Sequence, residues 1–165
     1  MPKRHLKRKR KPTLKEMRKG VLSVRYEPRS KWRKLIEKDP DYKFLRRQEL
    51  KDIAEKILEQ VAHPQLITLD YVDAKRIIES GKSLSVISFK LNNPESLLKD
   101  CRERLKDEKF KNAVVIVSGG GSMRLESVGE IMRVFVKKCE DLTTTANVNE
   151  NLKGKEILVE AVLVK

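Results

Sequence analysis

The hydrophobic positions of this chain change their spacing near residue 81. Before that point they repeat every three or four residues, which predicts a helix over 41–62 and a shorter one over 71–79. After it, short apolar runs alternate with helical repeats. The predicted strands are 84–89, 113–117, 143–148 and 156–164, and the predicted helices are 94–108 and 124–139. This alternation indicates an α/β fold, in which helices cover a mixed sheet.

Shorter elements are predicted elsewhere. Thr13 followed by Glu16 is a capping-box pattern, which predicts a helix over 13–19. A weak alternation predicts a strand over 21–26. Ser30 is a favourable N-cap for a helix through residue 38. Residues 65–69 are predicted to form a loop.

Composition excludes several classes of protein. No apolar run reaches the roughly 18–20 residues of a membrane span, and no apolar segment follows the basic N-terminus as it would in a secretory signal. Cys101 and Cys139 have no metal-ligand spacing, and we expect both to be buried, reduced thiols on helices of a cytoplasmic protein. His5 and His63 are far apart, so neither a metal nor a cofactor is predicted.

The excess positive charge is confined to the first 48 residues. Residues 1–48 hold 19 Lys/Arg and 5 Asp/Glu, a balance of +14, whereas residues 49–165 hold 19 of each kind. Such a dense cationic segment favours a polyanionic partner, because binding releases that partner's counterions. We therefore divide the chain into a basic N-terminal arm, 1–48, and a neutral domain, 49–165.

The arm places aromatic residues beside its cations. Tyr26, Trp32, Tyr42 and Phe44 are four of the eight aromatic residues of the chain. Cations contact phosphates and rings stack on unpaired bases, so this pattern predicts nucleic-acid binding. The alternative for Trp32 is that it packs its helix against the domain. The predicted contacts are Lys3, Arg4, Lys7, Arg8, Lys9, Arg10, Lys11, Lys15, Arg18, Lys19, Arg25, Arg29, Lys31, Trp32, Arg33 and Lys34.

Three segments of the neutral domain match the motifs of one protein family. Residues 66–75 read LITLDYVDAK, residues 113–120 read AVVIVSGG and lead to LESV at 125–128, and residues 146–152 read ANVNENL. In this order they resemble the C-terminal half of FtsZ, the tubulin-like division GTPase, most closely its archaeal forms. The resemblance covers about two-thirds of the chain. It implies the FtsZ C-terminal fold, a mixed four-stranded sheet with covering helices, preceded by a long helix and here by a basic extension.

The family's nucleotide-binding half has no counterpart in this sequence. In FtsZ it precedes the long helix and carries a G-G-G-T-G-[ST]-G phosphate loop. The segment SGGGS at 118–122 aligns instead with paired glycines of the C-terminal domain, and no Lys-[Ser/Thr] follows it as a P-loop requires. We therefore predict a tight turn there, no catalytic residue and no enzyme.

The loop at 68–73 has two interpretations. In the family, the acids that match Asp70 and Asp73 reach the nucleotide site of the next subunit, although Thr68 stands where the family has Asn. The loop could then contact an FtsZ-type subunit through Thr68, Asp70 and Asp73. Alternatively, Asp70 simply caps the helix that begins at Tyr71.

Together these features predict a non-enzymatic RNA-binding protein, ribosomal or ribosome-associated, whose basic arm binds rRNA in the ribosomal particle. One alternative is a regulator or capping partner of FtsZ-type filaments that acts through the loop at 68–73. Another is a division adaptor that binds DNA non-specifically, because the sequence contains no helix-turn-helix or zinc finger. No membrane partner is predicted.

Overall fold

The computed structural model describes residues 22–26, 43–44, 47–59, 65–67, 69–81 and 83–165. Within these ranges, seven strands form one mixed sheet in the order β2-β1-β4-β7-β5-β6-β3. The four long strands at its centre are β4 (Leu84–Leu91), β5 (Phe110–Gly119), β6 (Cys139–Val148) and β7 (Ile157–Val164). They confirm the predicted four-stranded mixed sheet. Three short strands widen it: β1 (Leu22–Tyr26), β2 (Lys43–Phe44) and β3 (Gln65–Ile67).

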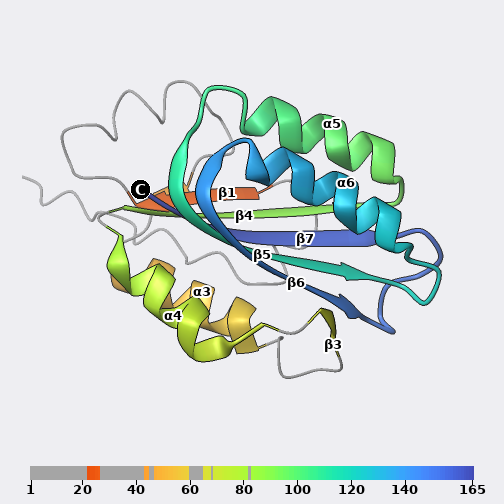
Figure 1. Ribbon diagram of the computed structural model, residues 1–165, viewed down its shortest axis with the longest axis horizontal. Helices are drawn as coiled ribbons and strands as arrows, with labels where there is room; N and C mark the ends of the chain where they lie inside the picture. The colour runs from red at the N-terminus through yellow and green to blue at the C-terminus, as the bar shows by residue number, and fades with distance from the viewer. Residues whose placement is uncertain (1–21, 27–42, 45–46, 60–64, 68, 82) are drawn as a thin grey trace, which may run out of the picture.

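Helices cover both faces of the sheet (Figure 1). One face carries α5 (Pro94–Arg104) and α6 (Leu125–Val136), and the other carries α3 (Arg47–Leu58) and α4 (Tyr71–Ser80). Each face has its own apolar core. Phe89, Leu97, Ile131 and Phe135 belong to the core under α5 and α6, and Leu50, Ile57 and Val162 belong to the core under α3 and α4.

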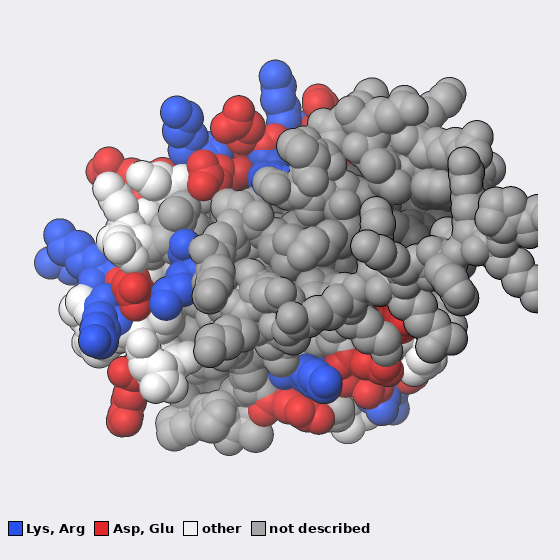
Figure 2. All heavy atoms as spheres, turned by 180° about the vertical axis from the view of Figure 1, so that it is seen from behind, with Lys and Arg blue, Asp and Glu red and all other residues white. Residues whose placement is uncertain are grey.

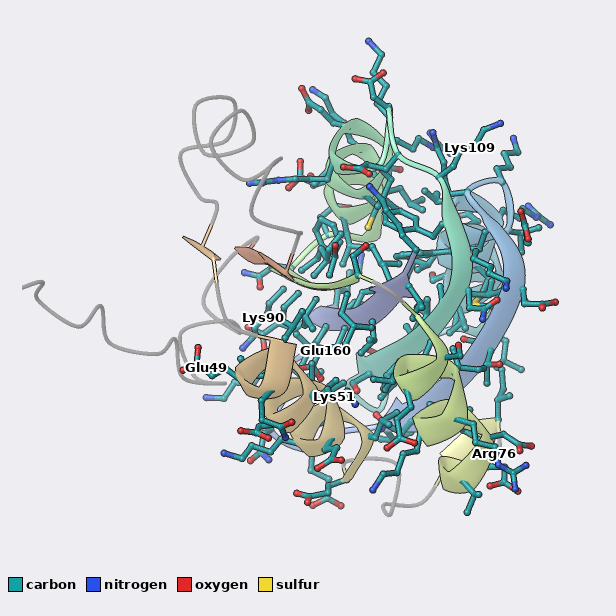
Figure 3. All side chains as sticks on the ribbon, turned by 90° about the vertical axis from the view of Figure 1, so that its left-hand side faces the viewer. Glu49, Lys51, Arg76, Lys90, Lys109 and Glu160 are labelled. Carbon is teal, nitrogen blue, oxygen red and sulfur yellow. The ribbon has the colours of Figure 1, made fainter. Side chains whose placement is uncertain are left out.

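The central position of β7 explains its composition. All eight of its residues are buried, since both neighbouring strands are paired and both faces are covered. Alternation along the strand sends Val159 and Ala161 to one core and Val162 to the other. Glu160 shares the face of Val162 and is fully buried opposite Ser88 of β4. Figure 3 shows Glu160 on the α3 side of the sheet.

The predicted helix over 71–79 is confirmed as α4. The helix predicted over 94–108 is confirmed as α5, but it ends at Arg104, where a turn begins. Asn93 caps α5 by accepting a hydrogen bond from the Glu95 backbone N–H at 2.9 Å, and Pro94 occupies its first turn. The strand predicted over 21–26 is confirmed as β1, which pairs antiparallel with β4. The predicted helices over 13–19 and 30–38 lie outside the described residues.

Three further predictions were wrong at their boundaries. The helix predicted over 41–62 begins only at Arg47, because Lys43 and Phe44 form β2 and pair with β1. The loop predicted over 65–69 contains β3, which pairs with β6. The helix predicted over 124–139 ends at Val136, and Cys139 opens β6, so that cysteine lies on a strand and is only half-buried.

Candidate functional site

Most of the predicted nucleic-acid contacts lie outside the described residues. The exception is Arg25, which belongs to β1 and is paired with Ser85 of β4. Residues before 49 therefore contribute strands to the sheet, since β2 continues it beyond β1. The first described residue of the arm is Leu22, at the start of β1, which lies between β2 and β4, the strand that α5 covers.

The loop before α4 is held by Asp70. Its carboxylate accepts hydrogen bonds from the backbone N–H groups of Val72 at 2.8 Å and Asp73 at 3.4 Å. These are two of the N–H groups that the first turn of a helix cannot satisfy internally. Asp70 is therefore the N-cap of α4, as one of the two interpretations predicted. Thr68 lies outside the described residues.

The surface around this cap is exposed and partly apolar. Val72 is 54% exposed and Ile67 is 37% exposed. The Asp73 side chain is also open to solvent, and its carboxylate lies 3.4 Å from the Arg76 guanidinium. Figure 3 shows Arg76 pointing away from the body of the molecule. The loop thus presents apolar and acidic side chains next to each other on the outside of α4.

The glycine segment at 118–122 forms a closely packed turn. A Cβ atom on Gly119 would lie 2.4 Å from the Met123 sulfur, and one on Gly120 would lie 2.7 Å from the Leu152 carbonyl oxygen. The Ser122 hydroxyl donates a hydrogen bond of 2.5 Å to the Gly154 carbonyl. These contacts tie the β5–α6 turn to the β6–β7 turn, and they explain the glycines by packing, as predicted.

The described cysteines are unreactive by environment. Burial, followed by the charge of Asp100, raises the pKa of Cys101 to about 12, and burial raises the pKa of Cys139 to about 11. A protonated thiol is a poor nucleophile and a poor metal ligand. Within the described ranges, no cluster of three or more His, Cys, Asp and Glu side chains could hold a metal ion. No helix there is long and apolar enough to cross a bilayer.

A basic groove between α5 and α6 was not predicted. It encloses about 400 Å³. Its lining consists of Leu98, Arg102, Lys106, Glu130, Arg133, Val134, Lys137 and Lys138. The signal that could have revealed it is a repeated spacing, since Arg102 and Lys106, and likewise Arg133 and Lys137, stand four residues apart.

The fold defines the class of protein: an α/β domain whose mixed sheet carries a helix pair on each face. No protein family profile and no curated protein matches the sequence. Among solved structures, the domain is similar to an FtsZ dimer, empty, from M. jannaschii, with a TM-score of 0.57 and 18% identity over 80% of this chain. An FtsZ mutant from the same organism gives a TM-score of 0.55 and 18% identity over 80% of this chain.

This likeness confirms the predicted FtsZ C-terminal-domain-like fold. The chain covers only 43% and 44% of these two FtsZ chains, so it spans less than half of their length. At this identity the likeness concerns the fold alone.

Proposed function

We propose that this protein is a non-enzymatic RNA-binding protein, ribosomal or ribosome-associated, that binds rRNA through its basic arm. The observation that carries the proposal is the separation of charge, with +14 on residues 1–48 and zero on residues 49–165. In this proposal the FtsZ-like domain is the rigid body to which the arm is joined. The division into an arm, 1–48, and a domain, 49–165, is part of the same proposal.

The charge of the domain supports an arm-centred interaction. Figure 2 shows cationic and anionic side chains interspersed over the described part of one face. Because residues 49–165 also carry no net charge, the long-range attraction of the domain for a polyanion is weak, and we assign that attraction to the arm. If Lys3, Arg4 and their neighbours up to Lys11 neutralise about six to eight phosphates, the log–log salt slope of RNA binding is about −5 to −7.

The test replaces the seven cations of residues 3–11 with Gln in the full chain. Binding to rRNA is measured by fluorescence anisotropy at several salt concentrations. The matched control removes seven exposed cations from the domain: Lys56, Arg76, Lys99, Lys111, Arg124, Lys153 and Lys155. We expect the arm variant to lose most of the affinity and of the salt slope, and the control to keep both. Equal losses in the two variants would refute the role of the arm.

Two further measurements identify the nucleic acid. Native lysate is sedimented at low and high salt, and the protein should travel with ribosomal particles only at low salt. Competition between rRNA and duplex DNA for the purified protein separates RNA binding from the DNA adaptor. Displacement by DNA at equal phosphate concentration would favour the adaptor.

A second candidate function rests on the exposed surface of the loop. Val72 is an apolar side chain in solvent, next to the acidic Asp73. Ile67, just before the loop, is also exposed, and an FtsZ-type subunit is the partner that we propose for this surface. The protein should then lower the plateau of FtsZ polymerisation in light scattering at an equimolar ratio. Val72→Glu should remove the effect, whereas Glu79→Lys, at the far end of α4, should not.

A further inference from the structure

The groove between α5 and α6 is a concave surface with a strongly one-sided charge. Arg102, Lys106, Arg133, Lys137 and Lys138 line it, against one carboxylate, Glu130. The domain as a whole is neutral, so this concentration is local. Leu98 and Val134 lie beneath the cations and are buried, at 8% and 6% exposure. Among the charged side chains that line the groove, cations therefore outnumber carboxylates by five to one.

The five cations lie at the C-terminal ends of α5 and α6. Cations in the last turn of a helix are stabilised by its partial negative charge, and Arg102 and Arg133 hold such positions. Three more cations stand at or directly after the helix ends, so the two helix C-termini gather five cations around one groove. Lys106 comes after α5, which ends at Arg104, and Lys137 and Lys138 come after α6, which ends at Val136.

The two helix ends are fixed to each other. The Lys138 ammonium donates a hydrogen bond of 2.6 Å to the Lys106 carbonyl. The Phe110 N–H donates to the Lys138 carbonyl at 2.8 Å, where β5 and β6 begin side by side. Figure 1 shows both helices ending at the same end of the sheet, where the chain also ends. The cations are thus held around one rigid concavity.

The cations that line the groove are available to a ligand. In the part of the chain that the structure describes, no carboxylate lies within ion-pair distance of Arg102, Arg133 or Lys137. All three side chains are exposed. An anion could therefore bind them without breaking an existing ion pair.

We propose that this groove binds the phosphodiester backbone of RNA, as a second contact separate from the arm. Three of its five cations are lysines, which protein–protein interface cores disfavour. Its two aliphatic lining residues, Leu98 and Val134, are buried and offer a protein partner no exposed anchor. Lysine and arginine are, in contrast, the usual partners of phosphate oxygens. The proposal shares its ligand class with the proposed function but does not depend on the arm.

The groove variant combines Arg102→Gln, Arg133→Gln and Lys137→Gln in the full chain. It spares Lys138, whose ammonium joins the two helix ends. The matched control combines Arg124→Gln, Lys153→Gln and Lys155→Gln, three exposed cations at the opposite end of the sheet. Both variants change the net charge equally, so a difference in their RNA affinity is due to the position of the cations and not to their number.

Binding to rRNA is measured between about 50 and about 200 mM salt. Loss of three phosphate contacts reduces the magnitude of the salt slope by about 2.7. This increase in salt should therefore reduce the RNA affinity of the wild type by a factor about 40 times larger than for the groove variant. The control should follow the wild type. As a direct readout, bound RNA should protect the amines of Lys106 and Lys137 from acetylation, but not those of Lys153 and Lys155.

The outcomes separate the two proposals. If the groove variant behaves like the control and Lys137 stays reactive, the groove proposal is overturned, whatever the arm variant does. Poly-glutamate and unlabelled RNA are compared as competitors for the groove. If poly-glutamate competes equally well, the groove binds acidic protein, and this result also overturns the groove proposal. If the arm variant binds normally but the groove variant does not, the proposed function of the arm fails and the groove stands.

Discussion

Asp70 provides a direct test of whether its carboxylate serves the fold. It accepts hydrogen bonds from the Val72 and Asp73 backbone N–H groups at the start of α4. Replacing a capping Asp by Ala costs about 0.5–2 kcal/mol, whereas Asn caps about as well as Asp. We therefore expect Asp70→Ala to lower the free energy of unfolding by about 1 kcal/mol, and Asp70→Asn to leave it almost unchanged.

The assay is urea unfolding followed by circular dichroism, supported by the melting temperature. In a chain of this size, 1 kcal/mol corresponds to a shift of about 2–4 °C. Asp73→Ala is the matched control, because Asp73 lies in the same turn but its carboxylate accepts a hydrogen bond from the exposed Arg76 side chain and caps no backbone N–H. An exposed ion pair contributes about 0–1 kcal/mol, so this control should be the milder change.

The comparison of Ala with Asn gives the refuting result. If both substitutions at residue 70 destabilise equally, the negative charge and not the capping geometry stabilises α4. If neither changes the free energy of unfolding, the cap contributes nothing and the carboxylate must be explained by a partner. Capping is supported only if Asp70→Ala lowers the free energy of unfolding and Asp70→Asn leaves it unchanged.

Three more predictions concern the rest of the domain. Phe135→Ala should destabilise the protein by about 3–5 kcal/mol in urea unfolding, because this fully buried ring fills the core under α5 and α6. Gly120→Ala should cost about 1–3 kcal/mol, since its Cβ would lie 2.7 Å from a backbone oxygen, whereas Gly121→Ala, with open space around it, should be tolerated. Cys101, with its pKa raised to about 12, should react with a thiol reagent at pH 8 only after unfolding, and fast labelling of the native protein would contradict its burial.

The sequence predicted well those elements whose signal is local. Asn93 followed by Pro94 marked the start of α5, and the apolar run at 113–117 marked β5, because caps and core strands are encoded in adjacent residues. β2 and β3 were missed because two or three residues become a strand only through a distant partner. The groove was missed for the same reason: its two pairs of cations lie about thirty positions apart and meet only when α5 and α6 pack together.

The helix layers of the fold limit where a ligand can bind. Helices cover both faces of the sheet, so within the described residues a macromolecule can reach only the sheet edges and the outer surfaces of the helices. If the arm alone binds RNA, the salt slope of the full chain is about −5 to −7. Three to five groove cations would increase the magnitude of that slope by about 2.7 to 4.5. A slope near −9 that falls to about −6 in the groove variant would support both contacts, because the two losses should add for separate sites. A slope of −6 that the groove variant leaves unchanged would assign the whole interaction to the arm.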